Sequence, residues 1–275
     1  TLTLTGGLRH FRFLNSEAGG VLSSFGCFEA GTPAGGCHDP TYSTNLNAKS
    51  LSDTEDGNRV RANLTWHLRS DLMLYYTFSQ GFRPGGFNQN GGAAHGIGAD
   101  GVAQYLVPRS YSSDNLTNNE VGWKTQWLGN TLRWNGSLFL ENWNNFQFSF
   151  LGENSVTIIR NGGNARIKGV ETSVDWLPVN GLLLSTNFTF LDPVLTQNYY
   201  GCIPGTPQCT PLPPVETPAG TNLPVTPKFK GNFIARYTCP LNGNWKPYAQ
   251  LSAMYQTETS PVLLTSGAST FFNAP

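Results

Sequence analysis

The sequence predicts an all-β protein, an antiparallel sheet of about nine strands that forms part of a transmembrane β-barrel. Three observations lead to this prediction. Segments of about 9–11 residues alternate between apolar and polar side chains, which is the length and pattern of a tilted strand that crosses a bilayer. Tight turns and long loops alternate between the segments, and such long loops are uncommon in compact soluble domains. Aromatic side chains collect at the segment ends, where interfacial girdles lie.

The composition supports a membrane-embedded sheet and excludes several other classes. Only 12% of the 275 residues are charged, against about 25% in an average soluble domain. The formal net charge is zero, so electrostatics gives no reason to expect binding to nucleic acid. No run of 18 apolar residues predicts a transmembrane helix, and no signal peptide is visible. Both ends of the chain suggest a piece of a longer protein.

The first half of the chain predicts four strands joined by two long loops and a tight turn. Strands are expected over residues 1–13, 59–68, 72–82 and 120–127. The loops are residues 14–56 and 83–115, and the turn is Arg69-Ser70-Asp71. Pro84 cannot donate to a strand ladder and Gly85-Gly86 permits a sharp bend, so the third strand is expected to stop there.

The second half predicts five more strands with the same rhythm of connections. They cover residues 132–150, 169–176, 182–190, 229–238 and 245–256. Turns are expected at Leu128-Gly129-Asn130, at Asn180-Gly181 and at Asn242-Gly243, and the Asn-Gly pairs are strong hairpin signals. Long loops run through Gly162-Gly163 and over residues 192–227, and the residues from Thr257 onward are read as loop.

The two faces of the predicted sheet differ in chemistry. The apolar face would meet lipid, and the polar face would line a lumen that carries Arg61, Lys124, Arg133, Glu141, Glu171, Asp175, Lys230 and Arg236. One aromatic girdle is expected near the tight turns, from Trp66, Trp127, Trp176 and Trp245. A second is expected near the long loops, from Phe78, Phe148, Phe150 and Phe190. The alternative is a soluble β-sandwich, in which alternation also produces one buried face.

Several motifs, in order along the chain, resemble the second half of a TonB-dependent outer-membrane receptor barrel. They are Tyr75–Phe87, Asn119–Lys124, Ser137–Gln147, Asn161–Ala165 with Gly169–Glu171, and Pro227–Asn232. Barrels of this type close roughly 22 strands around a plug. The resemblance implies that residues 1–275 are a partial barrel domain, roughly strands 11 to 19, without the plug domain and the last strands.

The same resemblance implies a function. It is the energy-coupled import of a scarce nutrient (an iron-siderophore, haem, cobalamin or a carbohydrate) across the outer membrane of a Gram-negative bacterium. The TonB-ExbB-ExbD complex would act on the protein's own plug domain through the missing N-terminal part. A receptor of this kind is not an enzyme. Two alternatives remain open: a passive outer-membrane porin, and a secreted soluble carbohydrate-binding or hydrolytic β-protein.

The long loops hold the candidate ligand-binding residues, which are aromatic or cationic: Phe82, Arg83, Phe87, Tyr105, Arg109, Tyr199 and Tyr200. Aromatic rings together with Arg can grip a chelate or stack on a sugar. The alternative is that these side chains order the loops among themselves. No ligand can be named from the residues.

The cysteines and acidic residues suggest no catalytic or metal centre. Cys27 and Cys37 share one loop and Cys202 and Cys209 another, so we expect a disulfide within each loop in an oxidising exterior, with Cys239 free. Cys37-His38 is the only neighbouring pair of potential metal ligands, which is too few for a site. Asp53, Glu55 and Asp56 could hold Ca²⁺, but a solvated loop is the simpler reading. Neither a cofactor site nor a catalytic triad is expected.

Overall fold

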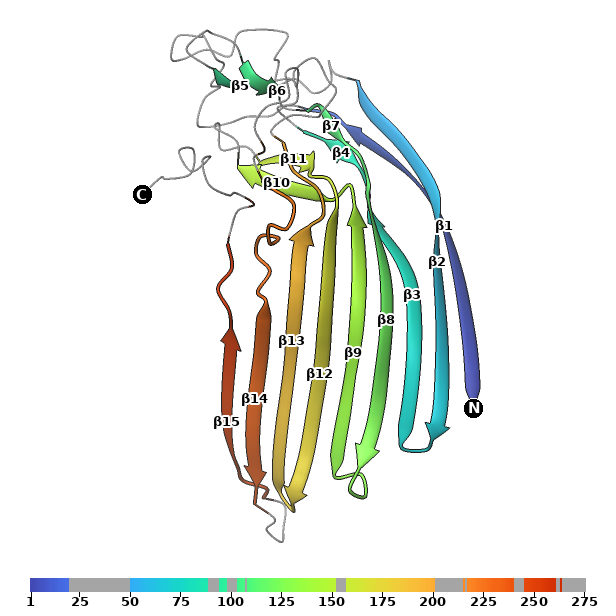
Figure 1. Ribbon diagram of the computed structural model, residues 1–275, viewed down its shortest axis with the longest axis vertical. Helices are drawn as coiled ribbons and strands as arrows, with labels where there is room; N and C mark the ends of the chain where they lie inside the picture. Colours follow the sequence, from blue (N-terminus) through green and yellow to red (C-terminus); the bar gives the residue numbers. More distant parts are fainter. Residues whose placement is uncertain are drawn as a thin grey trace.

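The protein is a single curved sheet with small loop ribbons at one end, as seen in the computed structural model (Figure 1). The structure describes residues 1–19, 50–88, 94–97, 103–106, 108–151, 157–200, 215, 217–239, 245–260 and 263, with only the backbone described at 94–97, 103–106, 150 and 151. In the described part of the chain, no helix has the length and apolarity needed to span a membrane.

Nine strands pair antiparallel in the order β1-β2-β3-β8-β9-β12-β13-β14-β15, each with its neighbour along the chain. Their bounds are β1 Leu2–Glu17, β2 Leu51–Arg69, β3 Leu72–Arg83, β8 Asp114–Trp127, β9 Leu132–Asn144, β12 Ala165–Val179, β13 Leu182–Leu195, β14 Phe229–Thr238 and β15 Tyr248–Gln256. β1 and β15 are the two edges of this sheet. The predicted antiparallel sheet of about nine strands is confirmed.

Three two-stranded ribbons stand at the end of the sheet that carries the long connections (Figure 1). They pair β4 (Gly86–Phe87) with β7 (Ser110–Tyr111), β5 (Ala94–Ile97) with β6 (Ala103–Leu106), and β10 (Gln147–Leu151) with β11 (Thr157–Asn161). We call this end of the molecule the rim.

The opposite end of the sheet carries the tight turns (Figure 1). Ser70 and Asp71 join β2 to β3, as predicted, and Arg69 lies 3.1 Å from Asp71. Leu128, Gly129 and Asn130 turn the chain from β8 to β9 with φ of 53°, 66° and 72°. The predicted turn at Asn180-Gly181 also forms, and φ of 89° at Gly181 is a conformation that glycine adopts without steric cost. Residues 240–244, with the predicted Asn242-Gly243 turn, lie outside the described residues.

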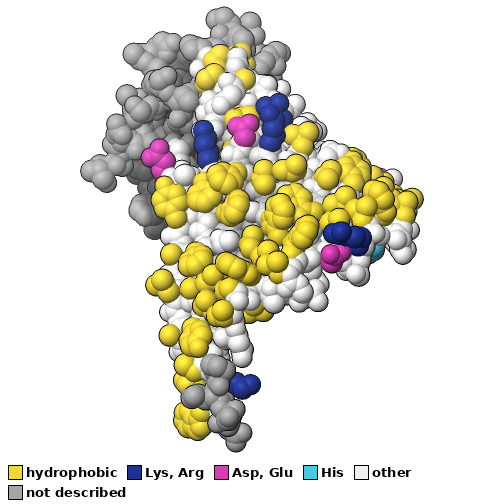
Figure 2. All heavy atoms as spheres, turned by 60° about the horizontal axis from the view of Figure 1, so that its bottom comes forward, with side chains coloured by type: hydrophobic (Ala, Val, Ile, Leu, Met, Phe, Trp, Pro, Cys, Tyr) yellow, Lys and Arg dark blue, Asp and Glu magenta, His cyan; other side chains and the backbone are white. Residues whose placement is uncertain are grey.

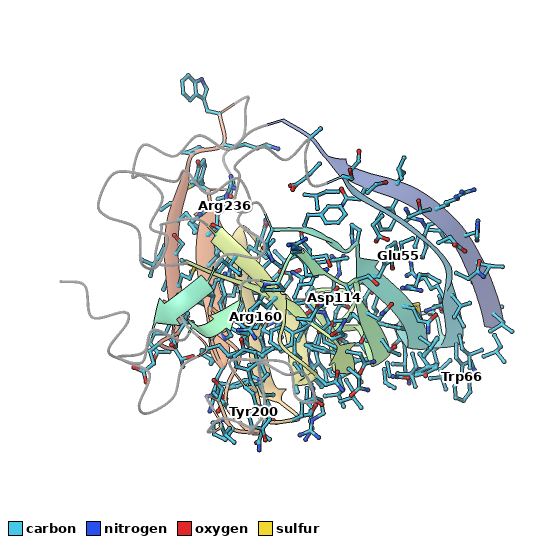
Figure 3. All side chains as sticks on the ribbon, turned by 90° about the horizontal axis from the view of Figure 1, so that it is seen from above. Glu55, Trp66, Asp114, Arg160, Tyr200 and Arg236 are labelled. Carbon is cyan, nitrogen blue, oxygen red and sulfur yellow. The ribbon has the colours of Figure 1, made fainter. Side chains whose placement is uncertain are left out.

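Strand register gathers the apolar side chains on one face. Val170 pairs with Leu138 on one side and Phe190 on the other, so these three side chains share a face. Leu138 is 51% exposed and Phe190 50% exposed. Figure 2 shows hydrophobic side chains in a band across this convex surface, with charged groups at its margins. Seen from above, Trp66 projects from the convex side, whereas Glu55 and Arg236 lie within the curve (Figure 3).

The concave face is polar. Register places on it all eight charged residues that were predicted for the lumen, namely Arg61, Lys124, Arg133, Glu141, Glu171, Asp175, Lys230 and Arg236. Arg133 and Asp175, which carry opposite charges, are direct register partners across β9 and β12. Register shifts occur in the described sheet between His67 and Arg69 and between Trp176 and Val179, both next to tight turns. From these positions toward the rim the pairing is regular, so the two faces stay distinct there.

Aromatic rings lie across glycines on neighbouring strands. Tyr75 is the direct partner of Gly122, Trp123 of Gly136, and Phe139 of Gly169. A Cβ built on any of the three glycines would come within 2.2–2.3 Å of the partner ring. The rings therefore occupy the space that a side chain would take, which fills the sheet surface and fixes the pairing register. This arrangement explains why Phe139 stands on the otherwise polar face.

The strands are longer than the apolar alternation predicted. β1 continues to Glu17 and β2 begins at Leu51, although residues 14–56 were expected to form a loop. β8 likewise begins at Asp114, β12 at Ala165, and β13 continues to Leu195. In these extensions apolar and polar side chains no longer alternate strictly, although the backbone ladder continues.

The predicted strand over residues 132–150 is wrong, because it is two strands in different sheets. β9 ends at Asn144, and Asn145 has a φ of 55°, a left-handed conformation that Asn tolerates better than most residues. β10 then pairs with β11 at the rim. Phe148 consequently packs against Phe146, with ring centroids 5.6 Å apart, and does not join a lipid-facing girdle.

Candidate ligand-facing rim

Arg83 and Asp114 form a clamp where β3 ends and β8 begins. Asp114 is 1% exposed, and its carboxylate accepts hydrogen bonds from the backbone N of Arg83 at 3.0 Å and from Nε at 2.9 Å. It also accepts one from the backbone N of Gln147 at 3.0 Å. The Arg83 guanidinium lies 4.8 Å from the Trp143 ring and donates to the Gln147 carbonyl at 2.5 Å. The clamp therefore neutralises the cation and joins β3, β8 and β10.

A seam of side chains replaces backbone pairing between β2 and β3 near the rim. The ladder between these strands ends at the pair Arg61 and Ser79. Beyond it, Phe82 stacks on Phe11 with ring centroids 3.9 Å apart. The Arg59 guanidinium lies 5.1 Å from the Phe11 ring and 4.6 Å from the Phe82 ring, and it donates to the side-chain oxygen of Asn115. Stacking and cation–π contacts thus hold the two strands together where no ladder does.

Three asparagines tie the rim loops to one another through backbone atoms. Asn88, 3% exposed, donates to the carbonyls of Pro108 and Ile159 and accepts from the Ile159 N–H at 2.8 Å. Asn161 donates to the carbonyls of Ser112 and Asn145 at 2.9 Å each. Asn145 donates to the Ser113 carbonyl at 3.1 Å. We call Asn88, Asn145 and Asn161 the asparagine latch.

No pattern in the sequence predicts the asparagine latch. Asn is common throughout the chain, and the latch partners lie between 16 and 71 positions away. No local pattern therefore marks these three residues; only the fold brings their partners within reach.

A small apolar core lies under the rim. Its buried members are Phe146, Ala165, Leu195, Tyr199, Leu223 and Leu263. Trp143 packs against Phe146 with ring centroids 5.7 Å apart, which explains its place on the polar face of β9. Tyr199 exchanges two backbone hydrogen bonds with Thr217, at 2.8 and 3.2 Å, so the segment after β13 is held over this core.

Tyr111, on the rim, has a raised pKa. It lies opposite Gly86 in the β4–β7 ribbon, and a Cβ on Gly86 would come 2.4 Å from the Tyr111 hydroxyl. Burial raises the pKa of Tyr111 above its ordinary value of 10.0, the Glu17 charge raises this pKa further, and Arg83 opposes both.

Comparison with known proteins identifies this architecture. A family model described as TonB dependent receptor-like, beta-barrel, matches residues 1–274. The chain belongs to this TonB-dependent receptor β-barrel family.

Solved structures share the fold at low sequence identity. The copper transporter OprC is 14% identical with a TM-score of 0.52, and the match covers 90% of this chain and 32% of that protein. The FrpB iron transporter from Neisseria meningitidis is also 14% identical, with a TM-score of 0.51 and coverage of 87% and 29%. The ferric yersiniabactin uptake receptor FyuA from Yersinia pestis is 14% identical with a TM-score of 0.48, covering 70% and 24%. The chain thus spans 24% to 32% of the length of these three structures.

Within this receptor barrel, the seven candidate ligand-binding residues fall into different environments. Phe82, Arg83 and Tyr199 make the contacts described above and order the rim. Phe87 is half-buried in β4, and Tyr200 is half-buried beside Tyr199. Arg109 is exposed, and its carbonyl accepts a hydrogen bond from the Asn88 N–H at 3.0 Å. Tyr105 belongs to β6, where only the backbone is described.

The cysteine predictions lie mostly outside the described residues. Cys27, Cys37, Cys202 and Cys209 all fall in segments that the structure does not describe, so their pairing stays a prediction. Cys239 is a free, half-buried thiol at the end of β14, as expected. Among the described residues, no group of three or more His, Cys, Asp and Glu side chains is arranged to hold a metal ion.

Proposed function

We propose that this chain forms part of the wall of an outer-membrane receptor that imports a nutrient with energy supplied through TonB. The observation that carries the proposal is the two-faced sheet in a chain of this family: an apolar convex surface that fits lipid and a charged concave surface that fits a plugged, hydrated lumen. Closing the sheet by further strands is required, because unpaired edge groups in lipid cost several kcal/mol each.

The partners act through the rest of the receptor. We place the complete protein in the outer membrane of a Gram-negative bacterium, with an N-terminal plug domain inside the barrel. TonB, energised by ExbB and ExbD, would pull on that plug. The eight charged residues of the concave face would contact the plug and the water around it. The family match over residues 1–274 supports the proposal that this chain is one part of the barrel domain.

The imported nutrient belongs to a class held by aromatic and cationic side chains, and an iron-siderophore, haem, cobalamin or carbohydrate each fits that description. Arg109, exposed on the rim, and Phe87, Tyr105 and Tyr200 are our candidates for contact with it. Phe82, Arg83 and Tyr199 would act indirectly, by positioning the loops that carry the other four.

Uptake assays with the full-length receptor test the proposal. Cells that depend on this receptor would be given radiolabelled ferric siderophores, haem, cobalamin or oligosaccharides, with and without functional TonB. We expect accumulation of one of these nutrients, and its loss in the strain that lacks TonB. Uptake that continues unchanged without TonB would identify a passive porin and overturn the proposal.

The ligand contacts have a sharper test. Arg109→Gln should raise the nutrient concentration needed for half-maximal uptake while leaving the amount of receptor in the membrane unchanged. Arg69→Gln, an exposed arginine at the opposite end of the sheet, is the matched control. Equal behaviour of the two variants would remove Arg109 from the binding site.

A further inference from the structure

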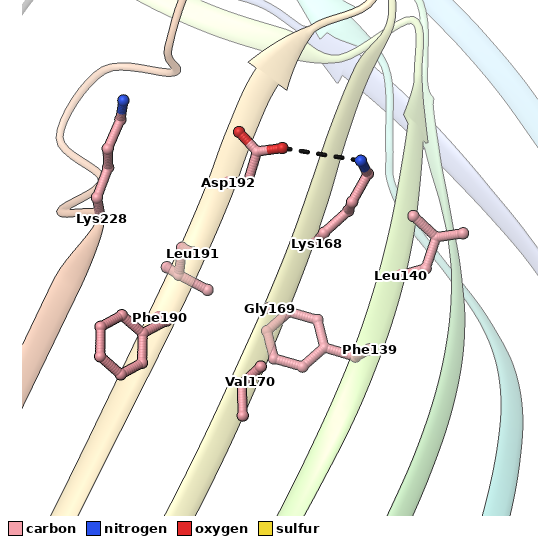
Figure 4. Close-up of a pocket in the computed structure, with 9 residues that line it drawn as sticks. All are labelled: Phe139, Leu140, Lys168, Gly169, Val170, Phe190, Leu191, Asp192 and Lys228. Carbon is pink, nitrogen blue, oxygen red and sulfur yellow. Dashed lines mark ion pairs between the residues drawn. The ribbon is translucent and has the colours of Figure 1, made fainter.

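β2 and β3 are paired across the apolar band and part just above it. The outermost pair of apolar residues that joins them is Ala62 with Phe78, and the row of partners containing this pair continues to β13. Figure 4 shows the same row further along the sheet, where Lys168 lies 3.9 Å from Asp192. Within the bilayer every backbone group has to be paired, whereas above it water can replace a partner strand. The end of the band is therefore the first level at which two strands can separate at low cost.

The separation affects only the boundary between β2 and β3. Their ladder ends at Arg61 and Ser79, one pair beyond the apolar band. β1 and β2 nevertheless stay paired to the end of β1, and β3 stays paired with β8 to the end of β3. Figure 1 shows β1 and β2 running together to the rim and diverging from β3 in the upper part of the sheet. Residues 9–17 and 51–60 are thus a two-stranded unit, about 33 Å long at about 3.3 Å per residue. We call it the outer hairpin.

Side chains supply the contacts that hold the outer hairpin against β3. Phe11 lies opposite Gly57, and a Cβ on this glycine would come 2.9 Å from the Phe11 ring. The ring therefore crosses β2 over the glycine backbone and reaches Phe82, with ring centroids 3.9 Å apart. Nearer the rim, the Asn15 side chain donates a hydrogen bond to the Gly85 carbonyl at 3.0 Å.

The convex surface of the outer hairpin fits water and not lipid. His10, Arg12, Asp56 and Asn58 continue the convex parity of the two strands, and all four are exposed. The bilayer therefore does not restrain this unit, and its position depends on the seam with β3.

We propose that the outer hairpin is a hinged flap of the barrel wall. It rotates as one body about the last pair of the β2–β3 ladder, and the seam together with the Asn15 hydrogen bond holds it closed. Opening carries Asn15 away from Gly85, which directly precedes β4 and its candidate ligand contact Phe87. The flap thereby adjusts the position of Phe87. This last consequence rests on the proposed function, whereas the hinge itself does not.

The test measures distances in the full-length receptor in nanodiscs, without any nutrient. Unnatural amino acids that carry a nitroxide replace Ser52 and Asn142, which are both exposed, so the native cysteines stay unlabelled. Double electron–electron resonance then gives the distance between the two labels. A rotation of about 10° would move Ser52, about 30 Å from the hinge, by about 5 Å. We expect a second distance in the unchanged receptor. Phe11→Ala should raise its population at least about threefold, because the substitution removes a ring stack and a cation–π contact.

Two further variants separate the seam from the rest of the hairpin. Gly57→Ala places a Cβ against the Phe11 ring and should raise the same population. Leu14→Ala changes a side chain that is 69% exposed on the same hairpin, and it should leave the distances unchanged. Backbone hydrogen exchange at residues 9–17 and 51–60 should be equal in Phe11→Ala and the unchanged receptor, because a rigid flap keeps its own ladder. Heat-modifiable migration on electrophoresis verifies that each variant is a folded barrel.

The outcomes distinguish a hinge from a fixed wall and from fraying. One and the same single distance in the unchanged receptor, Phe11→Ala and Gly57→Ala would overturn the proposal. Faster exchange within the hairpin of Phe11→Ala would show that its strands fray in place of rotating together, and would also overturn it. Two distances in a receptor whose uptake does not need TonB would support the hinge and refute only the proposed function.

Discussion

Asp114 shows how one buried side chain can hold several rim segments. It satisfies the backbone and guanidinium of Arg83 together with the backbone of Gln147, and its own side chain is almost fully enclosed. Arg83 would otherwise be an attractive ligand contact, since it is cationic and close to the loops. The geometry gives it a positioning role, because its polar contacts join β3, β8 and β10, and its contact with a ligand stays a prediction.

We expect Asp114→Asn to destabilise the rim. The substitution keeps the volume but turns an NH₂ group toward donors on Arg83 and Gln147. Charge-assisted hydrogen bonds contribute about 1.5–3 kcal/mol each, and the partial exposure of Arg83 reduces this, so we expect a loss of about 2 kcal/mol. Backbone hydrogen exchange at residues 82–88 and 147 measures this loss of local stability. Asp71→Asn disrupts an exposed pair and should cost less than about 0.5 kcal/mol; equal protection in the two variants would contradict the prediction.

Tyr111 gives the rim an alkaline sensitivity. Its pKa is raised in the folded protein, chiefly by burial, so the unfolded chain loses this proton first as the pH rises. The folded state then holds more protons than the unfolded state, and its stability falls once the pH exceeds the unfolded value near 10.

Tyr111→Phe should therefore flatten the loss of stability above pH 10 without changing stability at pH 7. Urea unfolding at a series of pH values gives the comparison, and tyrosinate absorbance follows the titration. Tyr76→Phe, on the exposed convex face, is the control. If the unfolding free energy of Tyr111→Phe falls above pH 10 as steeply as that of the unchanged protein, the Tyr111 hydroxyl does not cause the loss of stability at alkaline pH.

Among the strands, the glycine–aromatic pairs act as register markers. Trp123 covers Gly136 and meets Trp134 edge-on, with ring centroids 5.3 Å apart. A β-sheet that slips by one residue exchanges its two faces, so a ring that fits only one partner position opposes slippage. Such pairs occur between β3 and β8, between β8 and β9, and between β9 and β12.

Gly136→Ala should displace the Trp123 ring and cost about 1–3 kcal/mol, the usual range for overpacking. The near-ultraviolet circular dichroism of the Trp123 and Trp134 pair should weaken at the same time. Gly6→Ala is the control, since a Cβ there meets nothing within 4 Å. If both substitutions leave folding and circular dichroism unchanged, the ring does not depend on the glycine.

The strands also show what the sequence could and could not predict. Period-2 alternation predicted both faces, and turn residues such as Asn180-Gly181 predicted the hairpins, because both signals are local. β10 was missed because Phe146, Phe148 and Phe150 continue the parity of β9, so only the backbone at Asn145 separates the strands. That Arg83 orders the loops was one of the two predicted roles, but its partner Asp114 could not be predicted, because it lies 31 positions away, across a loop.

For the whole molecule, the apolar convex surface fits contact with lipid. Leu138, in the middle of the apolar band between Val121 and Val170, is the position at which a charge should be most costly. Arg at the midplane of a transmembrane barrel costs about 2–4 kcal/mol.

Leu138→Arg should lower the folding free energy of the full-length receptor in lipid vesicles by about that amount. Asn187→Arg introduces the same charge on the concave face and should cost less than about 1 kcal/mol. Urea titrations in vesicles measure both. Equal costs for the two variants would mean that the two faces have similar surroundings, which would contradict a lipid-facing convex surface.

The asparagine latch has a consequence for how such a receptor changes over generations. Among the described residues, Asn88 and Asn161 bind main-chain groups of Pro108, Ile159, Ser112 and Asn145. These groups are carbonyls and the N–H groups of Ile159 and Ser112, and every amino acid except proline supplies both. Substitutions at those partner positions would leave these bonds intact. The side chains that the rim exposes can thus change over generations while its main-chain framework stays in place.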